Sequence, residues 1–257
     1  MRSIRFQSSL VLAVFMALAG SGCGGDDSSG PTSCVGGVAL CGVSDPEILY
    51  LGFDGTGTSV PNFASTPPAG SETATLMGGL TQGSTGRCGG AVVGSGISST
   101  TDYVNTGWAT SLGAGSWTIS FWTAEIGPSG TLFYIFGDAG ATSFRCFTNG
   151  VAGADNWMLR GGGLTDVLVT GGATVAPHTT TLVHDSVAAE IRAYVDGVLV
   201  NTVAQGVPVI TGAGPFKVVG YSANVGMPSG GMLDEFRVYN RALSAGEVAN
   251  LAAAACR

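Results

Sequence analysis

Clusters of glycine, proline and asparagine cut the chain from Asp45 onward into apolar runs that are too short for long helices. Glycine accounts for 43 of the 257 residues and shows no Gly-X-Y period, so it marks turns and not a collagen helix. Charged residues make up only 11% of the chain, which disfavours a helical protein with a salt-bridged surface. The pattern therefore predicts an all-β protein of short strands.

The apolar runs predict individual strands. Residues 117–122 place Trp117, Ile119 and Phe121 on one face and the intervening side chains on the other. The pair Asp196–Gly197 between two apolar runs indicates a β-hairpin with a two-residue turn. The other clear runs are Ile48–Phe53, Leu132–Phe136, Ile191–Val195, Val198–Val200, Phe216–Val219 and Phe236–Tyr239. This density of strands is typical of a sandwich or a barrel.

The end of the chain departs from the strand pattern. Ser244, followed three residues later by Glu247, forms a capping box, in which each side chain accepts a hydrogen bond from the other residue's backbone amide. We expect a helix from about Ala245 to Ala255. Its packed face would carry Val248, Leu251, Ala252 and Ala255.

The first residues predict export. Arg2 and Arg5 precede the apolar run Leu10–Ala19 and the small residues Gly20–Gly22, which is the pattern of a secretory signal. The apolar run of about ten residues is too short for the roughly 20 that a membrane-spanning helix needs. We therefore expect the mature protein to have no transmembrane helix.

Residues Gly20–Cys23 resemble a bacterial lipobox. The resemblance implies that residues 1–22 are a lipoprotein signal peptide and that Cys23 carries acyl chains, which anchor the exported protein to a bacterial membrane at the cell surface or in the periplasm. The polar, Gly- and Ser-rich segment that follows cannot form a core, so residues 23–45 are predicted to be a flexible tether. Ordinary secretion, with a free or disulfide-bonded Cys23, is the alternative.

The closing segment Gly231–Ser244, followed by Glu247 and Leu251, closely resembles the ending of LamG-like domains, which have the concanavalin A-like jelly-roll fold. Three upstream segments resemble further parts of that family in the same order, namely Gly89–Val104, the core strand Gly115–Trp122 and the hairpin Tyr194–Gly197. The resemblance assigns residues 46–257 to one such domain. It implies an all-β jelly-roll sandwich of two antiparallel sheets, with adjacent N- and C-terminal strands and a short C-terminal helix.

The same resemblance implies a calcium site. LamG-like domains often bind one Ca²⁺ near the junction of the first and last strands, with an Asp and backbone carbonyls among its about six to eight oxygen ligands. Asp234 matches the Asp of the closing motif, and Asp54 follows the first predicted strand. The family's loop that supplies further ligands is replaced here by Ser59–Gly70. The alternative is that Asp234 accepts hydrogen bonds from a neighbouring turn.

Disulfides persist in an exported chain, so cysteine pairing bears on the fold. The six cysteines are Cys23, Cys34, Cys41, Cys88, Cys146 and Cys256. Sequence alone does not choose among the possible pairings, and one cysteine is left over if Cys23 is lipidated. Cys88 and Cys146 lie inside the predicted domain, and we predict a disulfide between them. The chain has only 2 histidines and no Cys-x-x-Cys, which disfavours zinc.

The carboxylates are not arranged as a glycosidase on this fold requires. Such enzymes need two carboxylates across a cleft, and the Glu-x-Asp-x-x-Glu pattern that carries them in fold-mates does not occur here. Asp234 and Glu235 are adjacent, so on a regular strand they would point to opposite faces. His178 and His184 would stand about 20 Å apart along a strand, too far to ligate one metal. We therefore expect a protein that is not an enzyme.

Aromatic side chains next to polar or Gly-rich stretches are the candidate ligand platforms, because they offer a flat apolar face. They are Tyr103, Trp108, Trp157 and Tyr221, and burial within the sandwich is the alternative for each. The net charge of −7, the single lysine (Lys217) and the lack of a basic run disfavour nucleic acid as a partner.

These observations together predict a non-catalytic recognition domain for a glycan or an extracellular protein, which contacts the membrane only through its lipid anchor. Two alternatives remain. One is a structural envelope lipoprotein without a small ligand, and the other is a glycan-active enzyme on the same fold.

Overall fold

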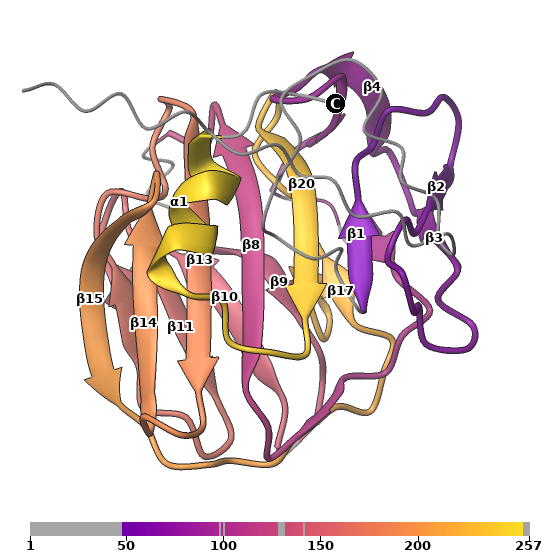
Figure 1. The fold of residues 1–257 in the computed structure, drawn as a ribbon. Coiled ribbons are helices and arrows are strands. Elements are labelled where there is room, and N and C mark those ends of the chain that lie inside the picture. The colour runs from indigo at the N-terminus through magenta and orange to yellow at the C-terminus, as the bar shows by residue number, and fades with distance from the viewer. Residues whose placement is uncertain (1–47, 98, 100, 128–131, 141, 254–257) are drawn as a thin grey trace, which may run out of the picture. The chain divides into compact units, whose positions relative to one another are not determined.

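The computed structural model describes residues 48–253 except 98, 100, 128–131 and 141. Within this part, β-strands form two large antiparallel sheets, and the only helix longer than a single turn lies at the C-terminal end (Figure 1). The predicted all-β, two-sheet sandwich with a short C-terminal helix is confirmed. The predicted signal peptide (1–22) and tether (23–45), with Cys23, lie outside the described residues.

The first layer is called sheet A. Its strands run in the order β15 (Val198–Ala204), β14 (Glu190–Val195), β13 (His178–Asp185), β8 (Trp117–Ala124), β20 (Met232–Tyr239), β5 (Gly90–Val93) and β4 (Thr81–Thr85), and β1 (Leu49–Leu51) also pairs with β20. Leu49 lies opposite Val238, so the first and last strands are adjacent, as the family resemblance implies.

The second layer is called sheet B. Its strands run in the order β12 (Val167–Val169), β11 (Trp157–Gly161), β10 (Phe144–Thr148), β9 (Phe133–Gly137), β17 (Lys217–Val218), β6 (Val104–Asn105), β3 (Thr73–Leu76) and β2 (Ser59–Pro61). Smaller elements are the pair β7 (Ser111–Gly113) and β16 (Ile210–Thr211), the pair β18 (Gly220–Tyr221) and β19 (Asn224–Val225), and the single-turn helix η1 (Gly150–Ala152).

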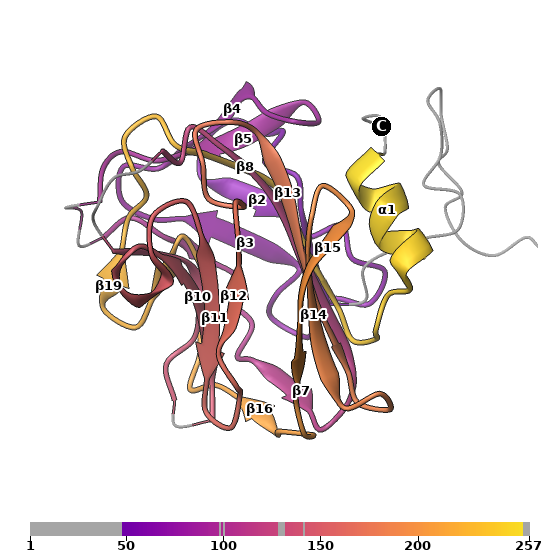
Figure 2. The same ribbon diagram turned by 90° about the vertical axis from the view of Figure 1, so that its left-hand side faces the viewer.

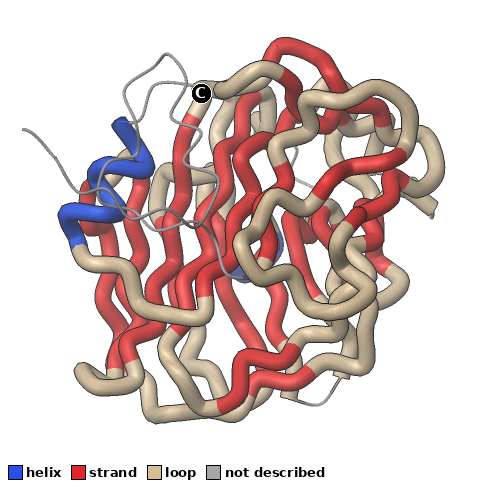
Figure 3. Tube along the Cα trace, turned by 45° about the vertical axis from the view of Figure 1, so that its right-hand side comes forward, coloured by secondary structure: helices blue, strands red, loops and turns tan. Residues whose placement is uncertain are grey.

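The two sheets lie face to face. Figure 2 shows the layers from the side, with helix α1 (Ala245–Ala253) on the outer side of β13, β14 and β15. Figure 3 shows that strands make up most of both layers and that long loops connect them on the side away from α1. Sheet A therefore has an outer face that α1 partly covers, whereas α1 leaves the outer face of sheet B uncovered.

Apolar side chains from both sheets meet between the layers. Trp117, Ile119 and Phe121 of β8 are each 0% exposed, which confirms their predicted placement on one buried face. The Phe121 ring lies 6.0 Å from that of Phe136 on β9 and 6.2 Å from that of Phe236 on β20, between ring centroids. Each fully buried large apolar side chain contributes about 1.5–3 kcal/mol relative to its exposed state, so this core holds the sheets together.

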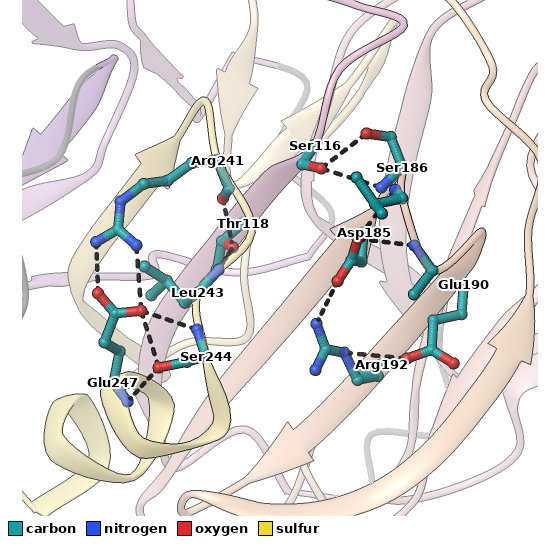
Figure 4. Close-up of polar contacts among 12 residues, drawn as sticks. Ser116, Thr118, Asp185, Ser186, Glu190, Arg192, Arg241, Leu243, Ser244 and Glu247 are labelled. Carbon is teal, nitrogen blue, oxygen red and sulfur yellow. Dashed lines mark hydrogen bonds and ion pairs between the residues drawn. The ribbon is translucent and has the colours of Figure 1, made fainter.

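Helix α1 begins at the predicted capping box. The Ser244 N–H donates to Glu247 Oε2 at 2.8 Å, and the Glu247 N–H donates to Ser244 Oγ at 3.3 Å (Figure 4). Arg241 binds the same carboxylate at 2.8 Å, which fixes the orientation of Glu247. The two reciprocal bonds satisfy backbone amides that a helix N-terminus otherwise leaves without a partner.

The apolar face of α1 packs against the outer face of sheet A. Val248 and Leu251 are buried there in a second apolar cluster, together with Val183, Tyr194, Tyr239 and Leu243. The predicted helix and these two packing residues are confirmed over Ala245–Ala253, while Ala255 lies outside the described residues. No helix in the described part of the chain has the length and apolar character needed to cross a bilayer.

The predicted hairpin between β14 and β15 is confirmed. Asp196 and Gly197 have φ values of 50° and 79°, which is the conformation that a two-residue turn of this kind requires. A Cβ on Gly197 would lie 3.0 Å from the Cα of Ala249 in α1, so glycine also allows the helix to approach the turn.

The predicted disulfide between Cys88 and Cys146 is not present. Cys146 is a free cysteine on β10, is 0% exposed and lies in the main apolar cluster with Phe136 and Leu159. Its burial raises the pKa of the thiol well above its ordinary range. Cys88 lies on the loop between β4 and β5 of sheet A. The two cysteines therefore belong to different layers, and the core surrounds one of them.

Candidate functional site

The four predicted ligand platforms separate into two kinds. Trp108 is 4% exposed and Trp157 is 0% exposed, so both are core residues. The Trp157 indole donates a hydrogen bond to the Gly172 carbonyl oxygen at 2.7 Å, and its ring packs against Phe121 with 5.8 Å between centroids. The proposal that these two tryptophans present a face to a ligand was wrong, and burial in the sandwich is the correct interpretation.

Tyr103 and Tyr221, in contrast, are half-buried and lie on the outer side of sheet B. Each ring has a cation over it. Lys217 Nζ lies 4.3 Å from the centroid of the Tyr103 ring, and Arg145 Cζ lies 4.8 Å from the centroid of the Tyr221 ring. A cation at this distance is attracted by the negative face of the ring, so the two tyrosines and two cations hold one another in position.

Further aromatic side chains continue from Tyr221 along the same face. The Tyr134 ring lies 5.2 Å from Tyr221 and 5.6 Å from Phe147, between centroids, and Arg160 Cζ lies 5.7 Å from the Phe147 centroid. Phe147 is 4% exposed and packs with Ala152 and Met158 in a small apolar cluster separate from the main core, so, like Trp108, it offers no face to a ligand. The set Tyr103, Lys217, Tyr221, Arg145, Tyr134, Phe147 and Arg160 is called the aromatic–cation row.

Strand register explains why the cations share one face. In sheet B, Lys217 of β17 lies opposite Gly137 of β9, Gly137 lies opposite Arg145 of β10, and Arg145 lies opposite Arg160 of β11. Residues directly opposite each other on paired strands project to the same face of a sheet. The three cations therefore lie on one line across four strands, although the chain separates Lys217 widely from the two arginines.

Gly137 gives Tyr221 its place in this row. A Cβ on Gly137 would lie 2.8 Å from Tyr221 Cδ2 and 2.9 Å from Arg145 Cβ, both shorter than carbon contacts allow. The missing side chain lets the tyrosine ring approach the backbone of β9 beside the arginine. The position of the ring thus depends on a glycine in the middle of a sheet.

The two arginines of the row differ in their partners. The Arg160 guanidinium forms a two-point ion pair with Asp166, with Nε at 2.7 Å from Oδ1, and this pairing raises the pKa of Arg160 and lowers that of Asp166. The Arg145 side chain makes no hydrogen bond or ion pair with any residue that the structure describes. Arg145 is half-buried, so a charged group with five N–H donors stands on the aromatic surface without a fixed acceptor.

Lys217 lies at the other side of Tyr221. Burial lowers the pKa of its ammonium, and the negative charge of Asp138 acts in the opposite direction. The ammonium donates a hydrogen bond to the Ser222 carbonyl oxygen in the loop between β18 and β19. Lys217 therefore ties that loop, which follows Tyr221, to the face of sheet B.

Both predicted calcium ligands, Asp54 and Asp234, lie at the loop between β4 and β5. Asp234 is 0% exposed, and its carboxylate accepts hydrogen bonds from the N–H groups of Cys88 at 2.8 Å and Glu235 at 2.6 Å. Burial raises the pKa of Asp234 to about 7, an effect that the Cys88 N–H opposes and that the charges of Glu235 and Asp54 increase. Asp54 is exposed and accepts a hydrogen bond from the Gly90 N–H at 2.7 Å.

This geometry agrees with the alternative in which Asp234 accepts hydrogen bonds from a neighbouring turn. No group of three or more His, Cys, Asp or Glu side chains in the described part of the chain is placed to hold a metal ion. Asp54 and Asp234 would have to be completed by backbone carbonyls and water to reach the about six to eight oxygens that Ca²⁺ takes. Calcium binding here stays a prediction, and a melting temperature that EDTA leaves unchanged would contradict it.

The side chains considered for catalysis lie in separate structural contacts. His178 Nδ1 lies 2.7 Å from Asp196 Oδ2 at the hairpin, whereas His184 is 0% exposed, with its ring nitrogens near backbone carbonyls. Glu235 has a φ of 52° at a bulge in β20, so the expected alternation does not hold there, and its carboxylate binds Arg237. These groups do not meet around one point.

Sequence reasoning missed Tyr134, Arg145, Phe147 and Arg160. The alternation within Phe144–Thr148 was the available signal for two of them. Arg145 and Phe147 are two residues apart on one strand, so their side chains are expected on the same face of the sheet. That signal shows a shared face but not which strands lie next to it. The register of sheet B supplies this missing information.

Comparison with known proteins agrees with this architecture. Residues 98–249 match the family described as the Concanavalin A-like lectin/glucanases superfamily. No curated protein matches the chain.

Several solved structures are similar. The binding domain of Paraclostridial Mosquitocidal Protein 1 is 16% identical with a TM-score of 0.59, over 80% of this chain and 52% of that chain. The receptor binding domain of the botulinum neurotoxin C/D mosaic serotype is 13% identical with a TM-score of 0.59, over 80% and 50%. The Botulinum Neurotoxin Type G Receptor Binding Domain is 11% identical with a TM-score of 0.60, over 81% and 51%. The chain thus spans about half the length of these structures, and at such identities the likeness shows the fold alone.

Proposed function

Because the chain belongs to the concanavalin A-like lectin/glucanases superfamily, we propose that it is a non-catalytic recognition domain that binds a glycan on the outer face of sheet B. The aromatic–cation row is the observation that carries this proposal. Tyrosine rings offer flat apolar faces with little conformational freedom to lose, and the cations beside them supply hydrogen-bond donors. An extracellular protein is the alternative occupant of the same face.

Two further observations support a binding role. The similar structures are binding domains or receptor binding domains, and extending that role to this chain is part of the proposal. The ionisable side chains considered for catalysis are each engaged in separate contacts, as described above. A domain with an aromatic face is suited to retaining a sugar.

A glycan array with the purified protein tests the proposal. Tyr221→Ala removes the ring between Arg145 and Tyr134, so the affinity for any glycan that binds should fall about tenfold. Phe63→Ala is the matched control, because Phe63 is an aromatic side chain that is 55% exposed and lies outside the row. Equal effects of the two changes, or release of reducing ends from a bound glycan, would contradict a non-catalytic site on this face.

We also propose that the domain is exported and attached to a bacterial membrane only through acyl chains on Cys23, with residues 23–45 as the tether. The support is the signal and lipobox pattern of residues 1–23. Wild-type protein should partition into detergent and incorporate labelled palmitate, and Cys23→Ser should release it into the aqueous phase. Recovery of unlipidated wild-type protein that begins after Cys23 would exclude the anchor.

The second candidate is a structural envelope lipoprotein. The exposed apolar run Val198, Leu199 and Val200 on edge strand β15 favours it, with exposures of 65%, 51% and 39%. An edge strand with apolar side chains is open to pairing with a second copy of the chain. Concentration-dependent self-association that Leu199→Lys abolishes, together with no retention of any glycan, would favour this candidate over glycan binding.

A further inference from the structure

We infer that the aromatic–cation row takes a carboxylate-bearing glycan and that Arg145 binds its carboxylate. The inference rests on the proposed function, because it assigns a chemical class to the ligand of the same face. It starts from the distribution of charge. The chain has a net charge of −7, yet Arg145, Arg160 and Lys217 lie on one line across the outer face of sheet B.

The acidic side chains whose charges affect these cations form no hydrogen bond or ion pair with Arg145. Asp166 is bound to Arg160 through two contacts. Asp138, whose charge acts on Lys217, is buried and accepts hydrogen bonds from Thr110 and Gly214. Arg145 acts on Asp166 only through its charge. One positive charge of the row is therefore available for an anionic ligand.

The Arg145 guanidinium is also held in position. It stacks 4.8 Å from the centre of the Tyr221 ring, and its Cβ lies beside Gly137. A guanidinium that is already ordered loses less conformational freedom when it forms hydrogen bonds. Its planar pair of N–H donors matches the two oxygens of a carboxylate, and such charge-assisted bonds are about twice as strong as neutral ones.

The surface beside Arg145 indicates that the carboxylate belongs to a sugar. The Tyr221 ring lies against the Arg145 guanidinium, and the Tyr134 ring lies 5.2 Å from that of Tyr221, so aromatic side chains and an anion-binding group are next to each other. An acidic sugar has both features, because a carboxylate is attached to a ring with an apolar side. A neutral sugar would use the aromatic surface but would leave the guanidinium without a counter-charge.

Binding to pairs of glycans that differ in the carboxylate tests the inference. The probes are polygalacturonate and its carboxyl-reduced form, sialyllactose and lactose, a heparin oligosaccharide for sulfate, and polyglutamate for an acidic peptide. Arg145→Gln should weaken binding of the carboxylated probe about tenfold or more and should weaken binding of the neutral member much less, because the neutral probe loses only the support that Arg145 gives to Tyr221. Arg145→Lys should recover only part of the loss, because an ammonium lacks the planar pair of donors.

Arg192→Gln is the matched control, because it removes the same charge from the outer face of sheet A, where Arg192 pairs with Asp185 and Glu190 (Figure 4). Carboxylated probes that bind more tightly than their neutral partners, with a loss confined to the Arg145 variants, support the inference. Equal binding of both members, or no binding of any carboxylated probe, overturns it. If the neutral glycans bind and Tyr221→Ala abolishes that binding, the inference about the carboxylate fails but the proposed function is supported. Binding of polyglutamate or heparin at least as tightly as the carboxylated glycans overturns the assigned class.

Discussion

A buried carboxylate in an apolar sandwich has to be matched by hydrogen bonds or by a change in protonation, and Asp234 shows both. The N–H groups of Cys88 and Glu235 donate hydrogen bonds to its carboxylate. Burial nevertheless raises the pKa of Asp234 to about 7. The closing motif points to Asp234 from the sequence alone. The sequence could not show that both hydrogen bonds come from the backbone, because one donor lies far away in the chain.

Asp234 should make stability depend on pH. Since its pKa is raised to about 7 in the folded protein, the folded state binds a proton that the unfolded chain releases near its ordinary value of 3.8. The stabilising contribution is full below the unfolded pKa and is lost as pH rises through about 7. In EDTA, the free energy of unfolding should fall by about 2 kcal/mol between about pH 5 and about pH 8.

Chemical denaturation at a series of pH values measures this effect. Asp234→Asn removes the titrating group and should flatten the pH dependence, even though it also loses one acceptor for a backbone N–H. Wild-type and variant curves that run parallel across this range would show that Asp234 does not carry the effect.

Gly137 tests whether the position of Tyr221 matters. A Cβ at residue 137 would push against Tyr221 and Arg145, so Gly137→Ala should weaken glycan binding about tenfold by displacing the ring. Gly206→Ala is the control, because a Cβ there meets no atom within 4 Å. Titration calorimetry with a glycan that binds the wild type measures the difference. Wild-type affinity in Gly137→Ala would mean that the tyrosine is not a binding surface.

At the scale of elements, local patterns predicted those strands whose alternation is regular and whose turns have a specific chemistry. Residues 117–122 and the Asp196–Gly197 hairpin are examples. The run Leu132–Phe136 was predicted as a strand, and its alternation is broken, because Tyr134 is half-buried on the outer face of sheet B while Ile135 and Phe136 both lie in the core. A shift of register between β9 and β10 accompanies this change.

The pairing of strands could not be predicted from local pattern. Strand β17 lies between β9 and β6, so Lys217 meets Gly137 on one side and Asn105 on the other. Such neighbours are determined by packing of the whole sandwich, since each isolated strand presents similar edges. The aromatic–cation row was therefore visible only in part, through Tyr103 and Tyr221.

The capping box of α1 should contribute measurably to stability. Ser244→Ala removes the acceptor for the Glu247 N–H, so the free energy of unfolding should fall by about 1 kcal/mol. Ser84→Ala is the control, because Ser84 is an exposed serine in strand β4. Urea denaturation followed by tryptophan fluorescence measures both. An effect of Ser244→Ala no larger than that of Ser84→Ala would show that the cap is not needed to hold α1 on sheet A.

At the scale of the whole molecule, the closing motif and the three upstream segments together predicted the fold, and the closing motif combines the last strand with the helix that packs on sheet A. Cysteine pairing was not predictable, since Cys146 points into the core, which sequence composition alone does not reveal. The outer faces of the two sheets also differ from each other. α1 covers part of one, and the other carries three cations and their aromatic neighbours.

The central claim is that the outer face of sheet B binds a glycan, and mapping of backbone amide shifts by NMR tests it most directly. A glycan that the array identifies would be titrated into isotope-labelled protein. The account predicts that the shifts concentrate on β9, β10, β17 and β18, with the largest near Tyr134, Arg145, Lys217 and Tyr221. Shifts confined to the residues around Asp54 and Asp234, or to edge strand β15, would place the ligand elsewhere and contradict it.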